Sequence, residues 1–129
     1  MLLVKTLIGP SAIEGIGLFA AEDIPKGTLV WRFVPGFDLE LTLGGFETLS
    51  EAAKDQMKHY AYISKKTGNY ILCSDDARFF NHAAEPNVIE VQDENEQEPP
   101  NAAARDIKKG EELTFDYRNF IDGLDFETK

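Results

Sequence analysis

Residues 106–117 read DIKKGEELTFDY, in which a turn signature, Asp106 to Gly110, leads into the β-branched and aromatic segment Glu112 to Tyr117. An earlier stretch has the same form, since residues 20–27 read AAEDIPKG and residues 103–110 read AARDIKKG. Glycine and proline at such positions favour tight turns, and the residues that follow favour strands. The chain therefore contains two equivalent strand–turn–strand units. Two copies are too few for a solenoid, so we expect a compact, mostly β fold with short strands.

Outside these units, strand-like segments bounded by Gly, Pro or Asn cover residues 2–8, 17–21, 28–34 and 70–74. Between Phe46 and Tyr60 apolar residues recur at spacings of three and four, which is the helical period. This is the one substantial helix that the sequence predicts, with Ser50 or Thr48 as its cap. The acidic run from Glu90 to Glu98 precedes two prolines and is typical of a solvated hairpin loop or a frayed strand pair.

Composition limits the classes of partner. The 129 residues include 13 Lys plus Arg and 23 Asp plus Glu, for a formal charge of −10, and 43% are hydrophobic. This length and apolar content predict one domain with one core. The acid excess disfavours nucleic acid, whose binders carry clustered cations, and favours a basic partner. An acidic mimic of DNA would explain the charge but none of the ordered motifs described below.

Cysteine, histidine and hydropathy exclude further kinds of site. Cys73 is the only cysteine, so an intramolecular disulfide and a Cys-rich zinc site are excluded, and we expect Cys73 to be a small core residue. His59 and His82 supply too few ligands for a metal, so none is expected. No run approaches the roughly 20 apolar residues of a membrane span, and the start lacks a basic leader. We therefore expect a cytoplasmic protein that does not bind membranes.

Four motifs follow one another in a fixed order: Gly15-Ile16-Gly17-Leu18-Phe19-Ala20, then Asp23-Ile24-Pro25-Lys26-Gly27, then Arg78-Phe79-Phe80-Asn81-His82 with Pro86-Asn87, then residues 106–117. The first lacks the third glycine and the following helix of a dinucleotide-binding unit. Together they resemble the SET-domain protein lysine methyltransferases over residues 5–118. The resemblance implies a SET fold of small, β-clip-like sheets with one or two short helices. It also implies a C-terminal pseudoknot that brings Asn81-His82 beside Phe115-Asp116-Tyr117.

The same resemblance implies transfer of a methyl group from S-adenosylmethionine to a lysine of a basic protein, such as a histone or histone-like protein. The residues that it places on the cofactor are Gly15, Ile16, Gly17, Asn81, His82 and Tyr117. Tyr117 matches the catalytic tyrosine, which would orient a neutral amine and the methyl group for in-line displacement. A dry aromatic channel would keep the lysine neutral by desolvation. Phe115 and Phe33 would line this channel, and Phe120, Phe126 or a second subunit would close it.

Several departures from the family pattern bear on these expectations. Residues 83–84 are both alanine where the family has Ser and Cys, and Phe33 replaces a channel tyrosine. Without a cysteine cluster, zinc-bound pre-SET and post-SET modules are not expected, so we predict a single SET domain over residues 1–129. Phe115 in place of tyrosine predicts di- or trimethylation, and Arg78 is expected to pair with an internal carboxylate. A SET fold that binds partners without turnover is the alternative function. Because some short members act as homodimers, a second copy is an expected partner.

Overall fold

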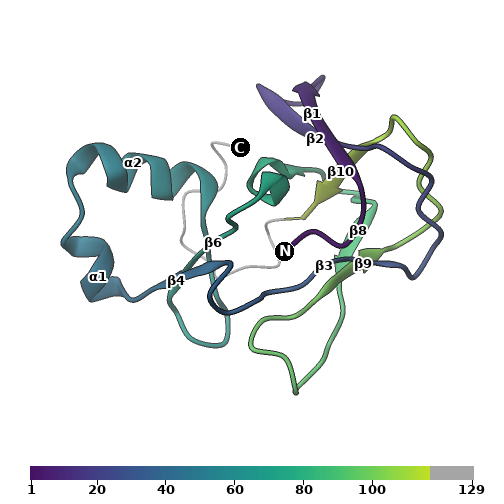
Figure 1. Ribbon diagram of the computed structural model, residues 1–129. Coiled ribbons are helices and arrows are strands. Elements are labelled where there is room, and N and C mark those ends of the chain that lie inside the picture. Colours follow the sequence, from purple (N-terminus) through teal and green to yellow (C-terminus); the bar gives the residue numbers. More distant parts are fainter. Residues whose placement is uncertain (117–129) are drawn as a thin grey trace.

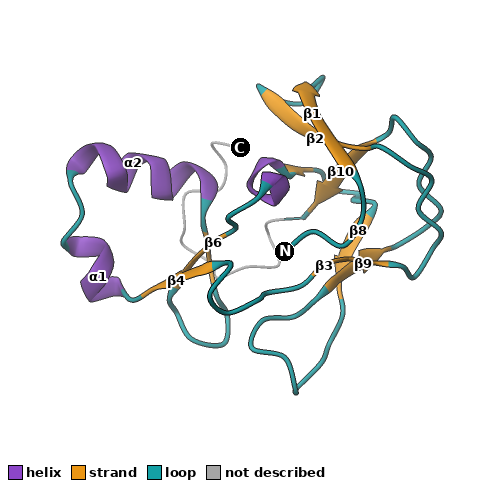
Figure 2. Ribbon diagram, viewed as in Figure 1, coloured by secondary structure: helices purple, strands orange, loops and turns teal. Residues whose placement is uncertain are grey.

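The computed structural model describes residues 1–116, which form short strands, two short helices and one 3-10 turn (Figures 1 and 2). The elements in chain order are β1 (Thr6–Pro10), β2 (Ile16–Ala20), β3 (Leu29–Trp31), β4 (Leu39–Leu41), α1 (Leu43–Glu47), α2 (Glu51–Tyr60), β5 (Tyr62–Ile63), β6 (Tyr70–Leu72), η1 (Asp76–Phe79), β7 (Asn81–His82), β8 (Val88–Glu90), β9 (Asn101–Ala103) and β10 (Glu112–Phe115). The prediction of a mostly β fold is confirmed.

The strands of the described part form three small sheets, with strand orders β1-β2-β10-β7, β3-β9-β8 and β4-β6-β5. Helices α1 and α2 lie together on one side of the molecule, next to the β4-β6-β5 sheet (Figure 1). In the four-stranded sheet, β10 is antiparallel to β2 and parallel to β7, with Thr114 opposite Asn81 and Phe115 opposite His82. These segments, distant in the sequence, therefore lie side by side as expected. The threading of the chain into a pseudoknot stays a prediction.

The two equivalent turn units pair with each other. Ile24 and Ile107 exchange two backbone hydrogen bonds of 2.8 Å. Oδ1 of Asp23 accepts a hydrogen bond of 2.9 Å from the backbone N–H of Lys109. In the same way, Oδ1 of Asp106 accepts one of 2.8 Å from the backbone N–H of Lys26. Because every contact has its counterpart, the repeated sequence corresponds to a local two-fold arrangement. This pairing joins the segment after β2 to the segment before β10.

The main core lies between the sheets. Its fully buried members include Leu18 of β2, Val30 of β3, Val88 of β8 and Leu113 of β10, each with 0% of its surface exposed. Every one of these strands thus contributes to a single apolar cluster, whose burial is the dominant stabilising contribution. Cys73 belongs to the same cluster, which confirms its prediction as a core residue. Burial raises the pKa of its thiol well above the ordinary value.

The expectation of one helix from Phe46 to Tyr60 is wrong, since the chain forms two helices separated by residues 48–50. Ser50 has an extended backbone, and its hydroxyl accepts a hydrogen bond of 3.1 Å from the N–H of Ala53, so it caps α2 as predicted. Thr48 is the C-cap of α1 and does not begin a helix. The helical spacing of apolar residues continues through this break, which explains why the periodicity concealed it.

The first strand is also displaced from its predicted position. It covers Thr6–Pro10 and not residues 2–8, while Leu2 makes only an isolated bridge to Trp31. Proline cannot donate a backbone hydrogen bond, but β1 is the edge strand of its sheet, where that loss is tolerated. Gly9 and Pro10 therefore extend the strand that they were expected to end.

The acidic run forms the predicted hairpin loop between β8 and β9, but its last carboxylate is not solvated. Glu98 is 2% exposed and accepts hydrogen bonds from the hydroxyls of Tyr62, at 2.8 Å, and Ser64, at 2.5 Å. Burial of a carboxylate requires such donors. The loop is therefore tied to the β5 region, where sequence alone predicted only a solvated charge run.

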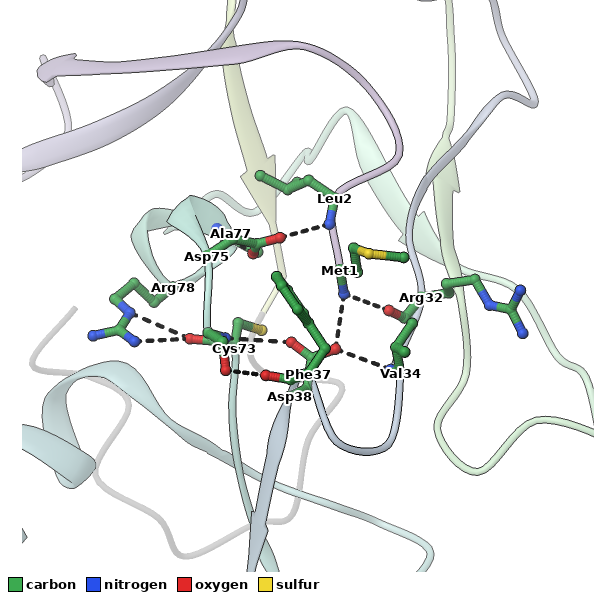
Figure 3. A network of polar contacts seen from close by, with 11 residues as sticks. Met1, Leu2, Arg32, Val34, Phe37, Asp38, Cys73, Asp75, Ala77 and Arg78 are labelled. Carbon is green, nitrogen blue, oxygen red and sulfur yellow. Dashed lines mark hydrogen bonds and ion pairs between the residues drawn. The ribbon is translucent and has the colours of Figure 1, made fainter.

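Asp38 joins segments that are distant in the sequence (Figure 3). Its buried carboxylate accepts hydrogen bonds from the N–H of Val34, at 2.9 Å, and of Ser74, at 3.3 Å. It also forms an ion pair of 2.8 Å with the ammonium group of Met1. Nearby, Asp75 accepts from the N–H of Leu2 at 2.8 Å. The two aspartates thus fasten the first residues of the chain against the segment that precedes η1.

Candidate cofactor-binding site

A cavity of about 280 Å³ lies where the β1–β2 turn, the end of α2, η1 and β7 meet. The residues that line it are Glu14, Gly15, Ile16, His59, Tyr60, Arg78, Phe79 and Asn81. Three of the six residues predicted to hold the cofactor, Gly15, Ile16 and Asn81, therefore face one cavity. The structure brings together the first and third sequence motifs, which are more than 60 residues apart.

Asn81 links these two motifs directly. Its buried side chain donates through Nδ2 to the backbone oxygen of Glu14, at 3.0 Å, and to Oε2 of Glu112, at 2.9 Å. A longer contact of 3.5 Å reaches the backbone oxygen of Ile16. Because the amide bonds to the residues on either side of Gly15, it fixes the end of the β1–β2 turn relative to β7. A hydrogen bond to a carboxylate is among the stronger kinds in proteins.

Glu112 explains why residue 17 is glycine. The carboxylate of Glu112 accepts from Ser11 Oγ at 2.8 Å and from Asn81, and it lies against the backbone of Gly17. A Cβ atom at position 17 would be 2.9 Å from the carboxyl carbon of Glu112 and 3.0 Å from Cβ of Ser11. The resemblance places Gly17 on the cofactor, and in this structure the space that a side chain at position 17 would need is taken by the carboxylate of Glu112.

Gly15 is required for a different reason. Its φ is +50°, in the left-handed region, and an added Cβ would meet no atom within 4 Å. The requirement therefore comes from backbone conformation, which glycine adopts at low cost. The left-handed residue turns the chain so that Glu14 and Ile16 both face the cavity.

His82 lies on β7 next to Asn81 but does not line the cavity. Its Nδ1 is 3.5 Å from Oδ1 of Asp116, just after β10. The backbone at this point is also bridged, because the N–H of Ala83 donates to the carbonyl oxygen of Phe115 at 3.1 Å. These contacts tie β7 to β10. The predicted contact of His82 with a cofactor stays a prediction.

The predicted channel residues fall into two groups. Phe115 and Phe33 are 3% and 5% exposed and both belong to the main core. Phe115 packs edge-on against Phe80, with ring centroids 6.4 Å apart. That Phe115 and Phe33 line a substrate channel stays a prediction. The predictions for Tyr117, Phe120 and Phe126 concern positions outside the described residues 1–116.

Among residues 1–116, Arg78 does not have the carboxylate partner that was expected. In the described part of the chain its Nε and Nη2 donate to the carbonyl oxygen of Cys73, at 3.2 and 3.0 Å (Figure 3). Its guanidinium carbon also lies 5.9 Å from the ring centroid of Tyr60. The backbone carbonyl that follows β6 takes the place of the expected acid. Arg78 therefore adds a held positive charge to the cavity wall.

Sequence reasoning missed several residues of the cavity. Tyr60 and Phe79 are in edge-on contact, with centroids 5.6 Å apart, and His59 lies beside Tyr60. The helical period places Tyr60 at the end of a helix but does not indicate what it faces. For Glu14, the only sequence feature that could have predicted its place in the cavity wall is its position immediately before Gly15. Its Oε2 is buried and has no hydrogen-bond partner within residues 1–116.

Residues 15–118 match the SET domain. This chain belongs to the SET-domain family. Human histone-lysine N-methyltransferase 2D is 29% identical over 119 residues, covering 91% of this chain and 2% of that protein. The H3 lysine-4 specific histone-lysine N-methyltransferase of Schizosaccharomyces pombe is 31% identical, covering 85% of this chain and 12% of that protein.

A solved structure of a humanized mutant of the Chaetomium thermophilum Polycomb Repressive Complex 2, bound to the inhibitor GSK126, resembles this SET domain with a TM-score of 0.66. The sequence identity is 26%, over 94% of this chain and 16% of the other. The SET domain described here thus spans a small part of the curated relatives that it matches. The predicted family and fold are confirmed.

Residues 1–116 contain no group of three or more His, Cys, Asp or Glu side chains arranged to hold a metal ion. Among the helices of this part, none has the length and apolar character needed to cross a membrane.

Proposed function

We propose that this SET domain is an S-adenosylmethionine-dependent lysine N-methyltransferase that acts on a basic protein. One observation carries the proposal: Gly15, Ile16 and Asn81 line one cavity, and β10, which pairs with β7, joins that site to the aromatic surroundings of Phe115. The histone-lysine methyltransferases named above support the reaction class, at 29% and 31% identity.

The cavity suits the chemistry of this cofactor, which combines an amino-acid end with a flat, apolar purine. Arg78 offers a positive charge in the wall of the cavity. Tyr60 and Phe79 offer aromatic surface. When bound, S-adenosylmethionine would supply a methyl group on a positively charged sulfur. The protein's part is to bind the two ends, orient them and exclude water.

The attacking lysine must be neutral. An environment built around buried side chains such as Phe115 and Phe80 penalises the ammonium form and lowers the pKa of an entering lysine. We propose that Tyr117 then orients the amine through its hydroxyl. The formal charge of −10 favours a positively charged substrate, such as a histone or histone-like protein.

The test is transfer of radiolabelled methyl groups to purified histones and histone-like proteins. Tyr117→Phe should reduce transfer strongly, whereas the matched variant Tyr70→Phe should leave it unchanged, because Tyr70 stacks on Phe46 in a separate cluster. Full labelling by Tyr117→Phe would refute the assigned role. Mass spectrometry of the product tests Phe115→Tyr, which we expect to restrict the reaction to lower methylation states.

The alternative is a SET domain that binds partners without turnover. The two alanines at positions 83 and 84 favour it, because the family has Ser and Cys there. Calorimetry separates the two proposals. Failure to bind S-adenosylmethionine excludes the enzyme, while binding without transfer to any basic protein supports the alternative.

A further inference from the structure

Strand β1 forms one edge of the four-stranded sheet in the part of the chain that the structure describes. It has five residues, whereas the other end strands of the three described sheets have only two or three. With β2 it lies at the top of the molecule in Figure 1, away from α1. Sheet edges in monomeric proteins are usually short, or carry charges that prevent pairing with another chain. The edge at β1 therefore offers room for a further strand.

The hydrogen bonds between β1 and β2 show which backbone groups of β1 point away from the sheet. The two strands are antiparallel and in continuous register. Just before β1, the carbonyl oxygen of Lys5 accepts a hydrogen bond of 3.0 Å from the N–H of Ala21. In an antiparallel pair, positions bonded to the neighbouring strand alternate with positions whose groups point outward. Thr6 and Ile8 therefore direct their N–H and C=O groups toward the free edge.

The side chains along this edge favour an apolar, uncharged partner. Leu7 is 62% exposed, the highest value among the large hydrophobic residues of the described part, and Ile8 is 46% exposed. Residues 6–13 include no charged side chain, although the whole chain has a formal charge of −10. A basic protein would find no carboxylate on this strand to pair with, whereas a second copy would meet no like charge there.

Strand β1 is also complementary to itself. When Thr6 of one copy lies opposite Ile8 of a second copy, two-fold symmetry forms the reverse pair as well. Every outward N–H of Thr6 and Ile8 then has a carbonyl oxygen of the other copy as its acceptor. The two Leu7 side chains lie directly opposite each other between these bonds, where cross-strand side chains come closest. The next symmetric register, with Ile8 opposite Ile8, would place each Leu7 opposite Gly9 and lose that contact.

We propose that this SET domain forms a two-fold dimer in which β1 of each copy pairs antiparallel with β1 of the other. The two four-stranded sheets then continue into each other, and the two Leu7 side chains cover one another. Because each copy contributes one short strand, we expect a small interface and a dissociation constant in the micromolar range. The dimer is independent of the proposed function, since Thr6, Leu7 and Ile8 do not line the cavity.

The experiment measures the dissociation constant of the full chain by analytical ultracentrifugation, for the wild type and for single variants. Leu7→Lys places two ammonium groups opposite each other across the two-fold axis. Thr6→Pro removes an outward N–H, a loss that an edge strand tolerates within its own sheet. Leu43→Lys is the matched control, because Leu43 is 56% exposed on α1 and the change in charge is the same. Thermal unfolding of each dilute protein checks the fold, and if Thr6→Pro melts early, Leu7→Lys alone decides the outcome.

We expect the wild type to dimerise, and added salt to tighten the dimer, because salt screens the repulsion between two chains of charge −10. Leu7→Lys and Thr6→Pro should each raise the dissociation constant about tenfold or more, whereas Leu43→Lys should not raise it. A wild type that stays monomeric at about 100 μM would overturn the inference. So would a dimer that a folded β1 variant leaves unchanged, or one that Leu43→Lys weakens as strongly as Leu7→Lys. None of these results depends on methyl transfer, so the proposed function is tested separately.

Discussion

Replacing Gly17 by alanine tests the packing at the centre of the site. The backbone at Gly17 does not have a positive φ, so alanine brings no conformational strain and the effect is steric. The new Cβ would be 2.9 Å from the carboxyl carbon of Glu112, which must move away. Movement would break the hydrogen bonds that the carboxylate accepts from Ser11, at 2.8 Å, and from Asn81, at 2.9 Å. At roughly 1.5 kcal/mol for each bond to a charged group, the loss is about 3 kcal/mol.

The assay is urea denaturation of a double-mutant cycle. In the wild-type background, Gly17→Ala should lower the free energy of unfolding by about 3 kcal/mol, the hydrogen-bond estimate above. In a Glu112→Ala background the carboxylate is already gone, so the same substitution should lower it by well under half of this amount. Gly15→Ala is the matched control. It meets no atom within 4 Å and should cost only about 1 kcal/mol, from its positive φ, in either background. Equal costs of Gly17→Ala with and without Glu112 would refute this account of the glycine.

Three further predictions concern other parts of the fold. Ser50→Ala should destabilise the protein by about 1 kcal/mol in urea denaturation, because the cap to Ala53 N–H is lost; an effect near zero would show that this cap contributes nothing. Cys73 should resist a thiol reagent at pH 8 in the folded protein and react in urea, because burial raises its pKa; equal rates would contradict its burial. Burial raises the pKa of Glu90, so the folded state holds its proton more tightly, and stability falls as pH rises from the unfolded to the folded pKa. Glu90→Gln should therefore melt above the wild type at pH 7, with the gap closing below about pH 4; a gap independent of pH would exclude this cause.

The sequence was informative where local rules and long-range structure agree. The repeat of residues 20–27 at 103–110 predicted two equivalent units, and the structure adds that Ile24 and Ile107 hydrogen-bond to each other. The resemblance carried by the ordered motifs placed Gly15 and Asn81 on one cofactor, and the structure adds that both residues line the same cavity. Both predictions depend on residues whose backbone conformation or neighbours leave few alternatives.

Sequence reasoning failed where a side chain's partner lies far along the chain. Glu98 looked like part of a solvated run, and only the hydroxyls of Tyr62 and Ser64, more than 30 residues earlier, explain its burial. That the carboxylate of Glu112 fills the space beside Gly17 was also not predicted, because nothing in the local sequence indicates it. The helical spacing of apolar residues also continued through the break between α1 and α2, where Ser50 caps the start of α2. Such outcomes depend on tertiary contacts, which composition and spacing do not determine.

The central place of β10 has a consequence for how the protein is made. During synthesis β2 and β7 emerge before β10, yet their shared sheet exists only when β10 lies between them. The backbone hydrogen bonds of Ile24 likewise form only after Ile107, 83 residues later, has been synthesised. Contacts of such long range make folding slow, and they make it late on the ribosome. A nascent chain that stops short of residue 112 has the glycine turn and Asn81 but no strand to hold them together, so ligand recognition should begin only when the chain folds as a whole.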